Sequence, residues 1–246
     1  MQAGAGKGDL MKKLLLALLF VPLLAFAAES ELHLDAAPDK LHDVAALQNG
    51  AKLFVNYCLN CHSASFMRYD RLRDIGLSNQ QIKDNLMFTA DRVGELMTIA
   101  MRRAEAKKWF GVAPPDLSLV ARARTSEAGS GADWLYSYLR GFYRDASRPT
   151  GWNNVVFANV AMPHALWELQ GEQVMGADHK LTLGKPGKLS PAEYDSAVGD
   201  LVAYLQYMGE PSADSRKRLG VFVLIGLLVL LVLSYALKRD YWKDIH

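Results

Sequence analysis

The sequence predicts a mainly α-helical domain followed by one membrane-spanning helix. Three features carry this prediction. Apolar residues recur at helical spacing before a Cys-x-x-Cys-His segment at 58–62, a strongly capped helical pattern covers 190–209, and 219–237 contains no charged residue. Strand patterns are sparse, and we expect residues 152–160 and 180–189 to form loops that include a small hairpin.

The N-terminal region has the pattern of a secretory signal. Lys12 and Lys13 form a basic start, residues 14–26 are apolar, and Ala25-Phe26-Ala27 is a small-x-small cleavage site. The apolar run is too short to span a bilayer as a helix. We therefore expect residues 1–27 to be a signal peptide.

The first ten residues are glycine-rich, and Met11 is an alternative start of translation. Beyond the signal, residues 29–43 are acidic and aperiodic, which predicts an extended strap rather than a helix. Residues 28–218 are long enough to form one domain with a sizeable core.

The segment Cys58-Leu59-Asn60-Cys61-His62 is the attachment sequence of a c-type haem. Two thiols about one helical turn apart can each add to one vinyl group of the same porphyrin, and the following histidine can then ligate the iron. These are the only two cysteines, which excludes a four-thiolate zinc site. A thioredoxin-like redox pair would follow a strand, whereas the residues before Cys58 have helical spacing. The motif predicts one covalently bound haem with His62 as an axial ligand.

Three helices are predicted in the middle of the chain. Ser78-x-x-Gln81 has the spacing of a capping box and opens a helix through Met87. Apolar residues at helical spacing over 93–104 predict a second helix, with Gly111 beyond its end. A third apolar stripe covers 135–142.

The last helix of the domain has the clearest boundaries. Ser190 is its predicted N-cap, Pro191 occupies the first helical position, and Glu193 completes a capping box. Gly209 ends the pattern. A polar link at 212–218 should then lead to the membrane segment.

The uncharged stretch 219–237 is about 28 Å long as a helix, close to the ~30 Å hydrocarbon core of a bilayer. Three basic residues precede it and three follow it, so the positive-inside rule does not orient it. The signal sequence does orient it. If the domain is exported, residues 219–237 form a membrane anchor and residues 238–246 form a cytoplasmic tail. This places the protein in a bacterial inner membrane, with residues 28–218 in the periplasm.

An iron held by His62 has an open position unless a second side chain fills it. Methionines on predicted helical stripes usually fill cores, and this description fits Met87, Met97, Met101 and Met208. Met67 is too near His62 in the chain, and Met175 lies in a polar, glycine-rich loop. Met162 is the leading candidate because the following proline keeps it out of helical geometry, and His164 is its main rival. A thioether ligand raises the reduction potential, as a late electron carrier requires.

Haem propionates are commonly paired with guanidinium groups, which bind carboxylates through two hydrogen bonds. Arg122 and Arg124 follow the segment Pro114-Pro115-Asp116-Leu117-Ser118 and are the candidates. For either residue, a solvated surface arginine is an equally good interpretation.

Taken together, the motifs resemble the cytochrome c1 family, the bacterial-type haem c subunits of the cytochrome bc1 complex (ubiquinol–cytochrome c oxidoreductase, respiratory complex III). The resemblance consists of the haem motif near the start, Ala113-Pro114-Pro115-Asp116-Leu117-Ser118 in the middle, the stretch Met162–Gly171 and one C-terminal anchor. It extends over the whole mature chain.

The resemblance implies a cytochrome c-like helical core with long loop insertions. It also implies that Met162 is the second axial ligand and that Arg124, ahead of Arg122, meets a haem propionate. Members of the family accept electrons from a Rieske iron–sulfur protein and pass them to a soluble or membrane-bound cytochrome c. Their anchor packs beside cytochrome b in a dimeric complex, so the chain would be an electron-transfer subunit and no enzyme on its own.

Charge patterning bears on partners. The formal net charge is +2 and no basic stripe with interleaved aromatics is present, which argues against nucleic acid binding. Residues 125–215 contain eleven acidic and six basic side chains, whereas 67–124 contain seven and eleven. An acidic face could steer a basic cytochrome. An ordinary solvated surface explains the same counts.

Two alternatives remain at this stage. The chain could be a different membrane-anchored c-type cytochrome that serves a periplasmic dehydrogenase or a terminal oxidase. It could also be a haem enzyme or gas sensor, which would keep an open iron position that binds carbon monoxide or cyanide.

Overall fold

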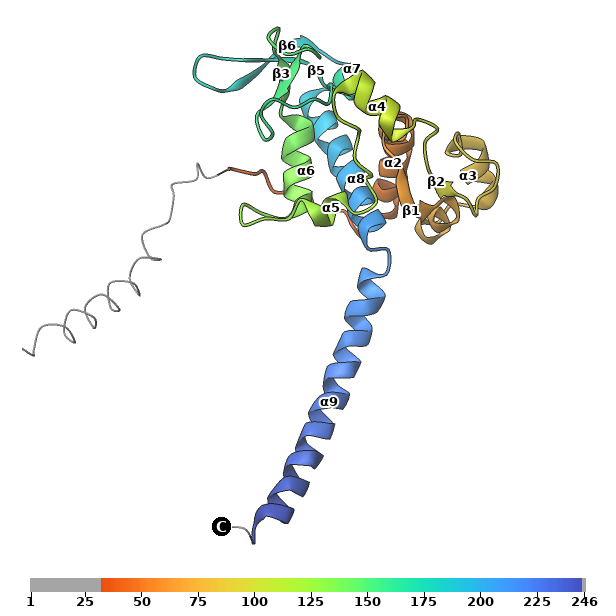
Figure 1. Ribbon diagram of the computed structural model, residues 1–246, viewed down its shortest axis with the longest axis vertical. Coiled ribbons are helices and arrows are strands. Elements are labelled where there is room, and N and C mark those ends of the chain that lie inside the picture. The colour runs from red at the N-terminus through yellow and green to blue at the C-terminus, as the bar shows by residue number, and fades with distance from the viewer. Residues whose placement is uncertain (1–31, 245–246) are drawn as a thin grey trace, which may run out of the picture. The chain divides into compact units, whose positions relative to one another are not determined.

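The computed structural model describes residues 32–244, so the predicted signal peptide at 1–27 lies outside the described residues. Figure 1 shows short helices and small hairpins gathered around helix α8. In chain order the elements are α2 (Val44–Leu53), the π-helical turn η2 (Phe54–Cys58), β1 (Ala64–Arg68), the 3₁₀ segment η3 (Tyr69–Ile75), α3 (Asn79–Asn85), β2 (Leu96–Met97), α4 (Arg103–Phe110), α5 (Val120–Ala123), α6 (Gly131–Arg140), β3 (Phe142–Arg144), β4 (Trp152–Asn154), α7 (Trp167–Gln170), β5 (Gly171–Met175), β6 (Leu181–Pro186), α8 (Pro191–Gly209) and α9 (Ala213–Trp242).

Helix α8 is the centre of the core. Helix α2 crosses it at Gly50, where a Cβ atom would lie 2.1 Å from the Asp200 carbonyl oxygen, so only glycine permits this approach. The buried rings of Phe54 and Tyr204 pack at a tilt of 49° beside this crossing, with centroids 5.6 Å apart. On its other side α8 packs on α6, and the Tyr194 hydroxyl donates to the Leu139 carbonyl at 2.9 Å.

Three antiparallel two-stranded sheets lie around the helices, in the pairs β1–β2, β3–β4 and β5–β6. The first pair joins Ala64 to Met97, which is fully buried, and so fixes the segment after the Cys-x-x-Cys-His motif. The third pair forms a hairpin that packs on β3.

The expected mainly α class is confirmed, and the locally encoded helix ends agree well. Both predicted capping boxes are present, at Ser78 before α3 and at Ser190 before α8. Helix α8 ends at Gly209 as expected. Residues 32–40 have no regular structure, as predicted for a strap, and the Asp35 backbone N–H donates to the Ser137 hydroxyl at 2.7 Å.

One predicted helix was wrong. The apolar stripe at 93–104 is largely irregular, with strand β2 inside it, because Met97 pairs with Ala64 and the carbonyls of Val93 and Glu95 accept hydrogen bonds from residues 69–70. Tertiary pairing overrides helical spacing here. The predicted polar link at 212–218, for which the sequence indicated no secondary structure, is mostly helical, since α9 begins at Ala213.

Helix α9 contains the one stretch among residues 32–244 that is long and apolar enough to cross a membrane. Residues 215–242 have a mean hydropathy of 2.8 in their most apolar window, and none of that window is buried by the protein. A uniformly apolar, unburied helix is typical of a segment surrounded by lipid. The predicted anchor 219–237 lies inside it.

Candidate functional site

The histidine of the Cys-x-x-Cys-His motif is oriented by a backbone carbonyl. His62 Nδ1 lies 2.7 Å from the Pro115 oxygen. A carbonyl can only accept, so Nδ1 carries the proton and Nε2 is left with a free lone pair for a metal. Burial lowers the pKa of His62, although the Pro115 hydrogen bond and the Asp116 charge oppose this. The imidazole is therefore held in the neutral form and in the tautomer that an axial ligand needs.

Residues 114–118 are fastened to the segment that follows His62. The Leu117 N–H donates to the Ser63 carbonyl at 2.8 Å. The Asp116 carboxylate accepts from the backbone N–H groups of Ser65 and Ser118, both at 2.8 Å. Burial raises the pKa of Asp116, but these hydrogen bonds outweigh it and hold the pKa below its ordinary value. The Pro-Pro-Asp-Leu-Ser motif thus sets the position of the carbonyl that orients His62.

The two thiols follow a wide helical turn. The Leu59 N–H donates to the Phe54 carbonyl at 2.9 Å, five residues back, and the N–H groups of Cys61 and His62 both donate to the Cys58 carbonyl. Both cysteines are free. Burial, with a smaller effect of Cys61, raises the pKa of Cys58 to about 12, so this residue is a protonated thiol.

The Met162 sulfur accepts a hydrogen bond from the Tyr138 hydroxyl on α6 at 3.3 Å. Burial raises the pKa of Tyr138, with Arg124 opposing, and the hydroxyl therefore remains a donor at neutral pH. A thioether sulfur has two lone pairs, so one remains for a metal beside this single hydrogen bond.

Two asparagines that the sequence reasoning missed organise the loop before Met162. Asn154 is 1% exposed, donates to the Tyr138 carbonyl at 2.7 Å and accepts from the N–H groups of Val156 and Phe157. The Asn153 side-chain oxygen accepts from the Asn159 N–H at 2.8 Å. The available sequence signal was a pair of adjacent asparagines among β-branched and aromatic residues. Such a stretch tends to be buried, and buried side-chain amides need hydrogen-bond partners.

His164, the rival ligand, lies in a cage of aromatic rings. It is 2% exposed, stacks on Phe142 with ring centroids 4.8 Å apart and meets the edge of Trp152 at 5.0 Å. Burial lowers its pKa to about 4, against an opposing effect of the Gln170 side chain, so the ring is neutral. The cage anchors the segment that carries Met162.

The two candidate arginines point to different places. The Arg124 guanidinium lies 4.2 Å from the ring centre of Trp134 and 5.6 Å from that of Phe157, beside Tyr138. Arg122 is exposed and its side chain lies against Gly209 at the end of α8. Only Arg124 thus belongs to the group of residues around Met162.

The structure therefore forms two groups, one around His62 and one around Met162. No hydrogen bond or ring contact joins them within residues 32–244. Ligands on opposite faces of a porphyrin would not touch either. Among the other methionines, Met67, Met97 and Met208 are core residues, 2%, 0% and 5% exposed.

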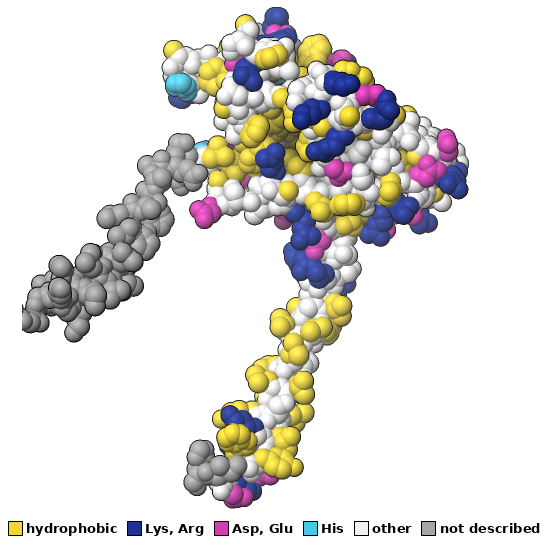
Figure 2. All heavy atoms as spheres, in the orientation of Figure 1, with side chains coloured by type: hydrophobic (Ala, Val, Ile, Leu, Met, Phe, Trp, Pro, Cys, Tyr) yellow, Lys and Arg dark blue, Asp and Glu magenta, His cyan; other side chains and the backbone are white. Residues whose placement is uncertain are grey.

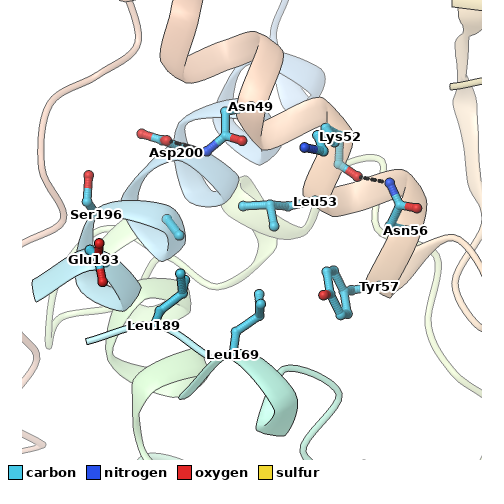
Figure 3. A pocket seen from close by; sticks show the side chains of 11 residues that line it. Asn49, Lys52, Leu53, Asn56, Tyr57, Leu169, Leu189, Glu193, Ser196 and Asp200 are labelled. Atoms are coloured by element: carbon cyan, nitrogen blue, oxygen red, sulfur yellow. Dashed lines mark hydrogen bonds between the residues drawn. The ribbon is translucent and has the colours of Figure 1, made fainter. Parts of the chain in front are cut away.

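Figure 2 shows hydrophobic side chains gathered in a hollow over α6, beside α4. A separate groove of about 560 Å³ lies between α2 and α8 and is seen in Figure 3. Its walls combine leucines with polar groups such as Asn49 and Asp200, which are hydrogen-bonded to each other at 2.7 Å. It contains none of the predicted ligands, although Tyr57 on its rim precedes Cys58.

The residues present fit a c-type haem. Two free thiols stand one turn apart, an imidazole has its second nitrogen free, and a thioether is held by one hydroxyl. This donor set matches the His/Met ligation of carrier cytochromes. In the part of the chain described, no cluster of three or more His, Cys, Asp or Glu could hold a separate metal ion.

Comparisons with known proteins agree with this site. The chain matches the Cytochrome C1 family over residues 36–245. It is 46% identical over 250 residues to cytochrome c1 of Allochromatium vinosum, covering 96% of this chain and 100% of the relative, and 30% identical over 230 residues to cytochrome c1 of Rhodospirillum rubrum, covering 83% of each. It is also 51% identical over 238 residues to a Nitrosomonas europaea protein named ammonia monooxygenase gamma subunit, covering 96% and 99%.

The family match covers nearly all of the described residues, and the apolar helix α9 falls within it. Proteins of this family carry haem c and transfer electrons as subunits of bc1 complexes, together with cytochrome b. The chain belongs to the Cytochrome C1 family, and is a membrane-anchored haem subunit of the electron-transport chain.

Proposed function

We propose that the chain carries single electrons through one haem c, attached to Cys58 and Cys61, from a Rieske iron–sulfur protein to a soluble or membrane-bound cytochrome c. The observation that carries the proposal is the His62 ring, whose Nδ1 donates to Pro115 and leaves Nε2 free directly after the paired thiols. When bound, haem supplies a reversible one-electron Fe(II)/Fe(III) couple.

Met162 is the proposed second axial ligand. Its sulfur is held by the Tyr138 hydroxyl, whereas the His164 ring stacks on Phe142. His164 Nε2 has no hydrogen-bond partner among the described residues, but the residue is 2% exposed, so a haem iron could reach it only if the surrounding residues moved. The Met162 side chain, which is only partly buried, needs no such rearrangement.

Arg124 is the proposed propionate partner, and Arg122 is the weaker candidate. Arg124 lies over Trp134 and beside Tyr138, so its guanidinium is on the same side as Met162. Stacking on a ring leaves the edge of the guanidinium plane available for a carboxylate.

The proposed topology places residues 28–218 in the periplasm after removal of 1–27. Residues 219–237 cross the membrane beside cytochrome b and 238–246 lie in the cytoplasm, in a dimeric complex. Helix α9 supports the anchor, and the export pattern of the first 27 residues supports the orientation. As in other carriers of this kind, quinone chemistry would take place on partner subunits.

The alternatives differ in the sixth iron position. An open-site haem enzyme, a gas sensor or an oxygenase subunit would need that position free, whereas Met162 would fill it. A different anchored c-type cytochrome would share the ligands but would copurify with a dehydrogenase or an oxidase instead of with cytochrome b and a Rieske protein.

The test is spectroscopic and uses the purified full chain. We expect its mass to exceed that of the polypeptide by one haem and the ferric form to show the far-red methionine-to-iron charge-transfer band. Met162→Ala should abolish the band and lower the midpoint potential by roughly 100 mV or more, because axial ligands tune haem potentials over about 0.8 V. Met175→Ala, which removes a methionine from β5, is the matched control and should leave both unchanged.

Persistence of the band in Met162→Ala would refute the ligand assignment. A mature chain with only its polypeptide mass would refute covalent attachment.

A further inference from the structure

Helix α4 has an unusual concentration of positive charge. Residues 102–112 contain four basic side chains and one acidic one, and Glu105 is already paired with Arg102. Arg103, Lys107 and Lys108 are exposed and have no hydrogen bond or ion pair within the described part of the chain. Unpaired exposed charges are the ones that set the local field seen by an approaching protein.

Apolar side chains accompany these charges. Trp109 is 65% exposed and its ring meets that of Phe110 edge-on, with centroids 6.5 Å apart. The helix itself is anchored by Ala106, which is 2% exposed. Exposed aromatics beside cations are typical of protein interfaces.

The position of α4 ties this surface to the haem site. Pro114 lies four positions after Phe110, a span of at most ~14 Å, and the carbonyl of the next residue, Pro115, orients His62. Figure 2 shows Lys and Arg side chains gathered over α4 on the same face as the hydrophobic hollow. A partner seated on α4 would therefore lie beside the proposed redox site.

The acidic region 125–215 is a poorer candidate for docking. Its carboxylates at 168, 172, 195, 200 and 210 are all paired with basic side chains. Asp133 and Glu193 are held in capping boxes. Most of the acidic side chains in this region are therefore paired or hydrogen-bonded within the fold.

We propose that a docking surface for an acidic electron-transfer protein is formed by Arg103, Lys107, Lys108 and Trp109. The acceptor would take its electron from the chain while bound at this surface. The proposal rests on the proposed function and narrows the acceptor to a protein with a negatively charged patch around its own redox centre. Attraction would act mainly on the association rate and would weaken as salt screens it.

The test uses the full chain with its haem, in non-ionic detergent, and one small basic c-type cytochrome as acceptor. The acceptor is used unmodified and after succinylation of its lysines, which makes it acidic. We expect the reduced chain to react faster with the succinylated form at low ionic strength, and the difference to vanish at high salt. Lys107→Glu/Lys108→Glu should slow that reaction at least tenfold, within the range of electrostatic steering.

Lys83→Glu/Lys180→Glu is the matched control, since it makes the same change in net charge at exposed positions outside α4. It should change the rate less than twofold. Equal effects of the two variants, or faster reaction of the wild type with the unmodified acceptor, would overturn the proposal. A slower reaction of Lys107→Glu/Lys108→Glu that is seen only in nanodiscs of anionic lipid would also overturn the proposal, because it would assign α4 to the membrane surface.

Binding of the succinylated probe, measured by interferometry on immobilised chain, separates this proposal from the proposed function because it needs no electron transfer. Binding that Lys107→Glu/Lys108→Glu abolishes supports the surface even if the haem spectrum contradicts the carrier role. Absence of binding to a chain with a normal haem spectrum overturns the surface alone.

Discussion

The two ligand groups are held in different ways. In the histidine half, residues 58–68 with 114–118, a backbone carbonyl contacts His62 directly, and the Asp116 carboxylate supports it by accepting from backbone N–H groups. The methionine half, residues 138–164, positions Met162 through side chains: a hydroxyl, two asparagine amides and a stacked imidazole. A backbone acceptor persists whatever the side chain, whereas a side-chain support is lost on substitution. The methionine half depends on more side chains and should therefore be the part that mutations disturb more.

The largest effect is expected at Asn154, whose side chain has three backbone partners. Asn154→Ala would leave the N–H groups of Val156 and Phe157 without partners and remove one of two hydrogen bonds to the Tyr138 carbonyl, at a cost of about 2 kcal/mol in the free energy of unfolding. The measurements are chemical denaturation of the full chain in detergent and the intensity of the far-red band, which should fall as Met162 becomes less well positioned.

Asn56→Ala, at a position just before the histidine half, is the matched substitution. The Asn56 side chain is exposed and donates only to the Lys52 carbonyl, so we expect a loss below about 0.5 kcal/mol. Equal destabilisation by the two variants would remove the distinction between the halves.

Local signals predicted the Cys-x-x-Cys-His motif of the histidine half and the starts of two helices outside it. The Cys-x-x-Cys-His spacing and the capping boxes at Ser78 and Ser190 are encoded within a few residues, and they can be read directly. The irregular segment at 93–104 could not be predicted in this way, because its structure depends on pairing with Ala64, some thirty residues earlier.

Removing one hydroxyl tests the support of Met162 itself. Tyr138→Phe should lower the midpoint potential by roughly 20–40 mV, because a hydrogen bond to the sulfur withdraws electron density and favours the ferrous state. Stability should fall by about 1 kcal/mol. Potentiometric titration is the measurement.

Pro115→Ala is the counterpart in the histidine half. The alanine retains the carbonyl that accepts from His62, so the potential should stay within ~10 mV and only the backbone entropy of the unfolded chain should change. If Pro115→Ala shifts the potential more than Tyr138→Phe, the contrast between backbone and side-chain support is wrong.

The sequence could rank the candidate ligands but could not reveal what holds them. Met162 was favoured because a proline follows it, and the resemblance to a family strengthened that choice. The role of the Pro115 carbonyl belongs to a backbone atom, which no residue pattern reports. The roles of Tyr138 and Asn154 depend on α6 packing against the loop at 153–160, a contact that only the fold creates.

The smallest effect is expected where the β5–β6 hairpin is fastened to β3, next to the methionine half. Arg144 donates to the Glu172 carboxylate at 2.9 Å, and this contact, with a smaller effect of Lys185, lowers the pKa of Glu172 to about 2. A folded-state pKa below the unfolded value of about 4.5 means that the stabilisation is complete above that pH. It is lost as pH falls from about 4.5 towards 2.

Glu172→Gln removes the charge and with it this dependence. The wild type should therefore melt at a higher temperature than Glu172→Gln above pH 5, and the difference should shrink towards zero near pH 2, as followed by circular dichroism. Glu127→Gln, at an exposed carboxylate with no ion pair in the described part of the chain, should show no such trend. A difference between wild type and Glu172→Gln that is constant from pH 6 to pH 2 would mean that the ion pair does not hold the hairpin. The methionine half would then rest on its uncharged side-chain contacts alone.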